Sequence, residues 1–125
     1  ETLAGKRVLV CFFDMNQRPS RRFVQELATR AKLMEESGLT VLLIQVGEAD
    51  ETVSQEWLAE TGMPFPLGTT SATMPALSRE WTVRALPWLV LLDKHHAIET
   101  AGFGLAQLDE GLKSGWSQPK ARPLE

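Results

Sequence analysis

The sulfur chemistry open to this chain is limited by its single cysteine, Cys11. Thiol–disulfide exchange needs one thiolate that attacks and a second thiol that resolves the mixed disulfide, so a lone cysteine rules out an internal redox pair. Cys11 also lies within the apolar run 8–13, where burial raises the pKa of a thiol and makes it unreactive. We therefore predict that Cys11 is a small core residue.

A serine nucleophile at Ser20 would need a neighbouring base, and the chain offers two histidines for that role. His95 and His96 fall in a polar turn between two predicted strands, distant from Ser20. We therefore predict that the Ser20 hydroxyl caps a helix instead of reacting. Adjacent histidines on a turn usually point apart, and no carboxylate or cysteine completes a ligand set, so we predict neither a metal nor a cofactor site.

Three arginines, Arg18, Arg21 and Arg22, gather where a helix is predicted to begin. Positive charge is unfavourable there because it opposes the helix dipole. Free backbone N–H groups flanked by guanidinium groups would bind a phosphate, a carboxylate or an acidic peptide, which gives the cluster a functional interpretation. The alternative is that the arginines are solvated, or pair with Asp14 or a more distant carboxylate.

The elements that must position these residues follow from apolar patterning. The unbroken apolar runs 8–13 and 40–46 are typical of strands covered on both faces. Apolar residues at helical spacing between 20 and 37 predict a helix that connects these strands in a parallel unit with a right-handed crossover. Asp50 is a suitable N-cap for a second helix at 50–60, with its apolar stripe on Val53, Trp57 and Leu58. The later elements are predicted as a helix at 74–81, a hairpin at 88–93 and 97–101, and a helix at 105–112. The element order is therefore β-α-β-α-α-β-β-α, an α/β architecture.

Composition indicates an ordinary globular domain. The chain has 125 residues, of which 43% are hydrophobic and 23% charged, and it has no apolar run long enough to cross a bilayer. Its formal net charge of −3 argues against a nucleic-acid partner. We assign residues 1–115 to one domain and 116–125 to a linker or a vector-derived tail. Because the chain begins at Glu1, we expect a processed product or one domain of a longer polypeptide; the cellular compartment is not indicated.

Three stretches in the right order carry a family resemblance. Residues 5–13 read GKRVLVCFF, residues 62–67 read GMPFPL, and residues 83–93 read VRALPWLVLLD. From residue 5 to about 112 the chain resembles a thioredoxin-like domain of the TlpA and redoxin (AhpC/TSA-related) type. The resemblance implies a central mixed four-stranded sheet flanked by helices.

The resemblance also assigns positions to the site residues. Gln17 and Ser20 stand where this family has its two redox cysteines, so no catalytic role carries over to either. Pro87 matches a proline whose preceding peptide bond is cis and which offers backbone groups to an extended peptide substrate. The alternative for Pro87 is a trans proline at the start of an edge strand.

Leu86 and Trp88 flank this proline, and with Met15 they are candidates for an apolar rim that would suit a protein partner. The alternative is that Trp88 and Trp81 turn inward and fill space left by the changed motif.

Two function hypotheses follow. The preferred one is a redox-inactive thioredoxin-like module that binds a peptide, a partner or a small anion through the loop 14–22 and the groove beside Pro87, without inserting into a membrane. The alternative is a thiol-disulfide oxidoreductase or antioxidant enzyme of the redoxin family that acts on a thiol compound such as glutathione, with Ser20 or Arg18 positioning the substrate sulfur. The absence of both redox cysteines argues against an enzyme, although the family's members are oxidoreductases and peroxidases.

Overall fold

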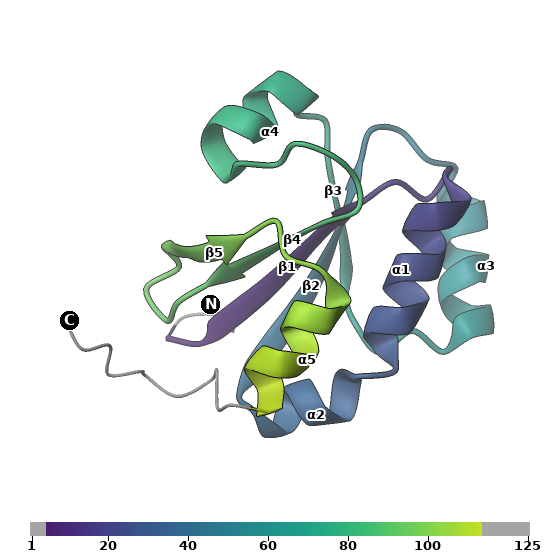
Figure 1. The fold of residues 1–125 in the computed structure, drawn as a ribbon. Coiled ribbons are helices and arrows are strands. Elements are labelled where there is room, and N and C mark those ends of the chain that lie inside the picture. Colours follow the sequence, from purple (N-terminus) through teal and green to yellow (C-terminus); the bar gives the residue numbers. More distant parts are fainter. Residues whose placement is uncertain (1–4, 114–125) are drawn as a thin grey trace.

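The computed structural model describes residues 5–113, which form a central sheet flanked by helices (Figure 1). The strands are β1 (Arg7–Phe13), β2 (Leu39–Val46), β3 (Leu67–Thr70), β4 (Trp88–Leu92) and β5 (Ile98–Ala101). Their spatial order is β3-β2-β1-β4-β5. Strand β2 runs parallel to both β1 and β3, whereas β4 runs antiparallel to β1 and β5. The mixed sheet predicted from the sequence is therefore present, with five strands instead of four.

The additional strand is β3, which the sequence pattern did not predict. It reads LGTT, and its one large apolar side chain, Leu67, is only partly buried. A short edge strand with glycine and threonine lacks both the alternation and the continuous apolar run by which strands are recognised. It forms because its backbone completes the free edge of β2, beginning with a bond from the Leu43 N–H to the Pro66 carbonyl at 2.9 Å.

The helices are α1 (Arg18–Ala28), α2 (Ala31–Glu36), α3 (Glu51–Thr61), α4 (Met74–Trp81) and α5 (Leu105–Lys113). The single helix predicted at 20–37 is in fact two helices, α1 and α2, separated at Thr29 and Arg30. The Arg30 backbone N–H bonds to the Leu27 carbonyl three residues earlier, which ends α1 with a tightened turn. The Arg30 guanidinium donates two hydrogen bonds, of 2.7 and 3.0 Å, to the Asp109 carboxylate of α5. These bonds are the main reason that the pKa of Asp109 lies below its usual value.

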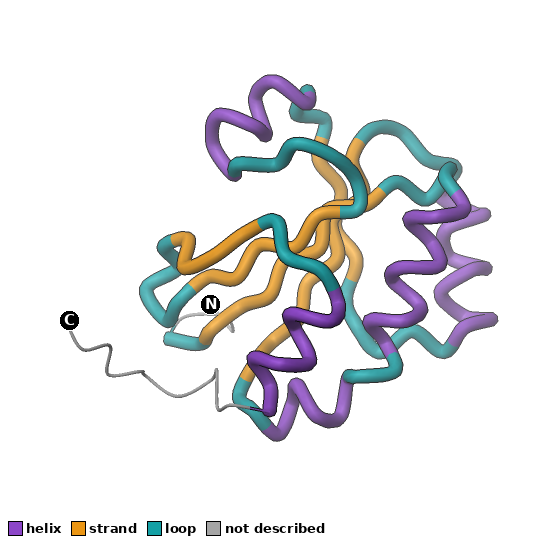
Figure 2. Tube along the Cα trace, in the orientation of Figure 1, coloured by secondary structure: helices purple, strands orange, loops and turns teal. Residues whose placement is uncertain are grey.

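The helices cover the two faces of the sheet unequally. Helices α1, α2, α3 and α5 pack on one face, whereas α4 alone packs on the other (Figures 1 and 2). On the first face, Leu27 of α1 and Leu108 of α5 are completely buried. Helix α3 contributes Trp57, whose ring centroid lies 6.3 Å from that of Phe13. Val53 is 55% exposed, so its predicted place in the apolar stripe of this helix was wrong.

No helix within residues 5–113 combines the length and the apolar character that a membrane span requires. The segment assigned from the sequence to a linker or vector-derived tail, residues 116–125, lies outside the described residues, as do residues 1–4 and 114–115.

Candidate functional site

A buried glutamine holds the loop that connects β1 to α1. Gln45, at the end of β2, is 1% exposed. Its Oε1 accepts a hydrogen bond from the Met15 N–H at 2.6 Å, and its Nε2 donates to Asp14 Oδ1 at 3.1 Å and to the Val46 carbonyl at 2.8 Å. Sequence reasoning missed Gln45. The available signal was one polar residue inside an otherwise apolar strand, where burial demands hydrogen-bond partners.

The rest of this loop is also fixed by hydrogen bonds. Asp14 Oδ1 accepts from the Asn16 N–H at 3.0 Å, and the Asp14 carbonyl accepts from the Gln17 N–H at 3.0 Å. The Asn16 side chain donates to the Glu48 carbonyl at 3.0 Å. The start of α1 is therefore held to the end of β2 and to the loop that follows it. A surface fixed in this way loses little freedom when it binds a ligand.

Gln17 and Ser20 differ in exposure as well as in chemistry. Gln17 is the exposed N-cap of α1, has extended backbone angles, and makes no side-chain capping bond. Ser20 lies one turn further on, is 0% exposed, and its Oγ has no hydrogen-bond partner within the described part of the chain. The predicted capping role of Ser20 is therefore wrong. The helix begins at Arg18, two residues earlier than the pattern indicated, so Ser20 is inside the helix and faces the core.

The three arginines line one hollow between α1 and α3. Together with Gln25 and Trp57, they line an open hollow with a volume of about 330 Å³. Arg21 donates to the Met15 carbonyl at 2.6 Å. Arg18 and Arg22 are exposed and form no ion pair with any of residues 5–113. No ion pair joins any of the three to Asp14, and two backbone or side-chain donors already occupy the Asp14 Oδ1.

The segment Leu86–Trp88 lies at the same end of the sheet but is a separate surface. The Leu86–Pro87 peptide bond is cis. Trp88 pairs with Phe12 across β4 and β1, and Leu86 and Trp88 pack against the α4-side core. None of the residues 86–88 lines the arginine hollow.

The tryptophans of this region turn inward. The Trp81 ring stands edge-on to Phe12 with centroids 5.4 Å apart. The Trp88 Nε1 is buried without a partner among the described residues, and its ring lies so close to Gly102 that a Cβ there would come within 2.7 Å of it. Met15 is 4% exposed and belongs to the core on the opposite face. The exposed apolar rim of Met15 and its predicted partners therefore does not form.

The remaining candidates take no part in the site. His95 and His96 are exposed in the turn between β4 and β5. The Asp93 carboxylate accepts from the backbone N–H groups of His95 and Ala97. Residues 5–113 contain no group of three or more histidine, cysteine or acidic side chains arranged to hold a metal ion.

Cys11 is completely buried in β1, and burial raises its pKa from 9.0 to about 12. Above pH 9 the unfolded chain loses the thiol proton while the folded chain keeps it, so deprotonation favours unfolding. We expect the free energy of unfolding to fall between pH 9 and about pH 12 because of this thiol. Between these two pKa values, the free energy of unfolding falls by up to about 1.4 kcal/mol per pH unit. Below pH 9 the thiol is protonated in both states, so it makes the free energy of unfolding no more dependent on pH.

The measurement is urea unfolding across this pH range, followed by tryptophan fluorescence, in the wild type and in Cys11→Ala. The chain has no tyrosine whose ionisation would obscure the signal. Lysine titration affects both proteins alike. The difference between the two plots of unfolding free energy against pH is therefore the contribution of the Cys11 thiol. Equal slopes would show that Cys11 is accessible to solvent.

The arrangement of these elements is that of a thioredoxin-like fold. The structure is similar to a thiol:disulfide interchange protein from Bacteroides sp., with a TM-score of 0.75, 15% identity, and coverage of 96% of this chain and 79% of that one. A secreted thiol-disulfide isomerase from Corynebacterium glutamicum gives 0.73 at 19% identity, with 94% and 74% covered. A thioredoxin family thiol:disulfide interchange protein from Chlorobium tepidum TLS gives 0.69 at 20% identity, with 91% and 82% covered. At these identities the likeness establishes the fold alone.

No protein-family model and no curated protein sequence matches this chain. Its function must therefore be inferred from its own site.

Proposed function

We propose that this protein is a redox-inactive thioredoxin-like binding module that holds an anionic ligand or an acidic partner at the start of α1. The observation that carries the proposal is the hollow in which Arg18, Arg21 and Arg22 stand together against Trp57. Arg18 and Arg22 have no carboxylate partner within residues 5–113, so their charges are available to a ligand. Their guanidinium groups suit phosphate or carboxylate oxygens, which they bind in pairs.

The lack of sulfur supports the redox-inactive part of the proposal. The solved structures with this fold include proteins described as thiol:disulfide interchange proteins, whereas this chain has one cysteine, and that cysteine is buried in β1. Gln17 and Ser20 cannot form a disulfide. The complete burial of Ser20 also speaks against the alternative in which it positions a thiol substrate, because its hydroxyl does not reach the surface.

The segment Leu86–Trp88 is the second part of the proposed binding surface. It stands at the end of the sheet where β1 leads into the loop 14–17, since Phe12 pairs with Trp88. All three residues are partly exposed.

The test uses inorganic pyrophosphate as the probe, titrated calorimetrically at low ionic strength. We expect the double variant Arg18→Ala/Arg22→Ala to bind at least about tenfold more weakly than the wild type, because a hydrogen bond to a charged group contributes about 1.5–3 kcal/mol. Arg79→Ala/Arg84→Ala is the matched control, since it removes two exposed arginines near α4 and should leave affinity unchanged. Equal loss in both double variants, or no binding to the wild type, would contradict the proposal.

A further inference from the structure

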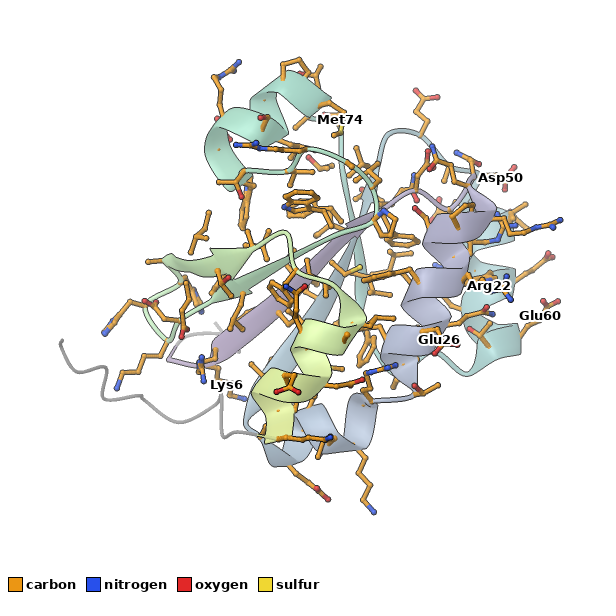
Figure 3. All side chains as sticks on the ribbon, in the orientation of Figure 1. Lys6, Arg22, Glu26, Asp50, Glu60 and Met74 are labelled. Carbon is orange, nitrogen blue, oxygen red and sulfur yellow. The ribbon has the colours of Figure 1, made fainter. Side chains whose placement is uncertain are left out.

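The arginine hollow combines positive charge with an amide and an aromatic ring. Its four polar residues are spaced i, i+3, i+4 and i+7 along α1, which places them on one face of that helix: Arg18, Arg21, Arg22 and Gln25. Trp57 lines the hollow from α3. In Figure 3, Arg22 lies on the side of the molecule where α1 and α3 run next to each other. A ligand of this hollow therefore meets three different kinds of side chain.

The positive charges of the hollow are not neutralised by the described part of the chain. Arg18 and Arg22 are four residues apart, a spacing at which like charges on a helix repel each other. None of the three arginines forms an ion pair with residues 5–113. The Arg21 guanidinium is held in place by its bond to the Met15 carbonyl. A phosphate group would reduce the repulsion and accept hydrogen bonds from these guanidinium groups.

Trp57 and Gln25 give the hollow a second, uncharged part. Trp57 packs on the core beside Phe13, with ring centroids 6.3 Å apart, and is partly exposed where it lines the hollow. The exposed Gln25 side chain makes no hydrogen bond to any of residues 5–113. An inorganic anion would use neither residue. An aromatic ring would stack on Trp57, and an amide both donates and accepts hydrogen bonds, which suits the edge of a nucleic-acid base.

The size of the hollow suits one ring and one phosphate. Its volume of about 330 Å³ is near the lower end for small-molecule sites, which range from about 300 to 1,000 Å³. From Arg18 to Gln25 the polar stripe is about 10 Å long, since a helix rises about 1.5 Å per residue. The formal net charge of −3 argues against a longer nucleic-acid strand. These observations together favour a single nucleotide.

We propose that the arginine hollow binds a nucleoside monophosphate, with the phosphate on the arginines, the base stacked on Trp57, and the edge of the base hydrogen-bonded to Gln25. This inference rests on the proposed function, because it uses the same arginines. It goes further by naming the class of ligand and by giving Trp57 and Gln25 roles that a simple anion site would not need.

The test compares small ligands of the wild-type protein by calorimetry at low ionic strength. Ribose 5-phosphate has the phosphate of AMP but no base, so we expect it to bind about tenfold more weakly than AMP, the effect of losing one stacked base. Adenosine lacks the phosphate and should also bind at least about tenfold more weakly than AMP. Phenyl phosphate keeps a ring but has no base edge for Gln25, so we expect it to bind about threefold more weakly than AMP.

Two variants assign these differences to residues. Gln25→Ala should weaken AMP binding about threefold, the effect of one hydrogen bond between neutral groups, and should leave ribose 5-phosphate and pyrophosphate unchanged. Gln55→Ala is the matched control, because it removes an exposed glutamine of α3 that does not line the hollow. Trp57→Leu should remove most of the difference between AMP and ribose 5-phosphate. Because Trp57 also packs on the core, the comparison of ligands on the wild type tests the stacking without this variant.

Pyrophosphate separates the failure of this inference from failure of the proposed function. If pyrophosphate binding depends on Arg18 and Arg22 but AMP binds no more tightly than ribose 5-phosphate, the nucleotide inference is wrong and the proposed function stands. Phenyl phosphate that binds as tightly as AMP would also overturn the nucleotide inference, because the base edge would then contribute nothing. If the wild type binds neither pyrophosphate nor AMP, both proposals are wrong.

Discussion

Replacing Gln17 and Ser20 together by cysteine is expected to give this chain a reversible disulfide and measurable insulin reductase activity. The two positions lie one turn apart at the start of α1, and three residues advance about 4.5 Å along a helix, within the Cα separation that a disulfide spans. A thiol at position 17 would be exposed, next to arginines and the positive end of the helix dipole, which lowers its pKa and activates it. A thiol at position 20 would be buried and placed to resolve the mixed disulfide.

The assay is the turbidity of insulin reduced in the presence of dithiothreitol. We expect the double variant to exceed the wild-type background by about tenfold or more, because exchange then has both an attacking and a resolving sulfur. Gln17→Cys alone and Ser20→Cys alone are the matched controls, and each should stay near the background. If a well-folded double variant forms no disulfide, positions 17 and 20 do not have the geometry described.

Replacing Gln45 by leucine is expected to destabilise the protein by about 1–3 kcal/mol and to release the loop before α1. The leucine has a similar volume but leaves the Met15 N–H and the Asp14 carboxylate without the bonds that Gln45 supplies. The loss is large because an unsatisfied buried group costs its full desolvation energy. Because Arg21 donates to the Met15 carbonyl, we also expect weaker pyrophosphate binding.

The measurement is urea unfolding followed by tryptophan fluorescence, with Gln55→Leu as the matched control. Gln55 is an exposed glutamine of α3, and its replacement should change the free energy of unfolding by no more than about 0.5 kcal/mol. If Gln45→Leu is as stable as this control, Gln45 does not hold the loop.

Much of the fold was predictable because its strands are strongly patterned. The continuous apolar runs of β1 and β2 and the short polar turn between β4 and β5 each have one physical interpretation, and the structure confirms them. The N-cap at Asp50 was also predicted from the sequence, and the structure confirms it, because the Asp50 carboxylate accepts a hydrogen bond from the Val53 N–H at 3.0 Å. Strand β3 was missed because tertiary pairing, not local pattern, makes it a strand. At the break between α1 and α2, Arg30 bonds to Asp109, a contact between distant parts of the sequence that no local pattern predicts.

The site was less predictable because it depends on contacts between elements. The sequence indicated the arginine cluster, but Trp57 joins it only through the packing of α3 beside α1, and Gln45 supports the loop from a strand about thirty residues away in sequence. The burial of Ser20 depended on where α1 begins, and a shift of two residues changed a predicted cap into a core position. Helix boundaries are weakly determined by local sequence, so errors of this size are expected there.

The separation of the arginines from Leu86–Trp88 has a consequence for function. In a single groove, one peptide would contact both sets of residues at once. Here the arginines face α3, whereas Leu86 and Trp88 pack toward α4 on the opposite face of the sheet. Ligand recognition at α1 can therefore be altered without disturbing the segment around Pro87, which makes the two surfaces separable by mutation.

The most direct test of the central claim, that this chain keeps a thioredoxin-like architecture without its sulfur chemistry, is the wild-type protein assayed for disulfide exchange. Purified protein free of contaminating reductase is mixed with insulin and with dithiothreitol as the reductant, and reduction of the insulin disulfides is followed over time by turbidity. We expect the wild-type rate to equal that of dithiothreitol in buffer alone, with Gln17→Cys/Ser20→Cys active in the same plate. A wild-type rate clearly above buffer that Ser20→Ala or Arg18→Ala abolishes would contradict it.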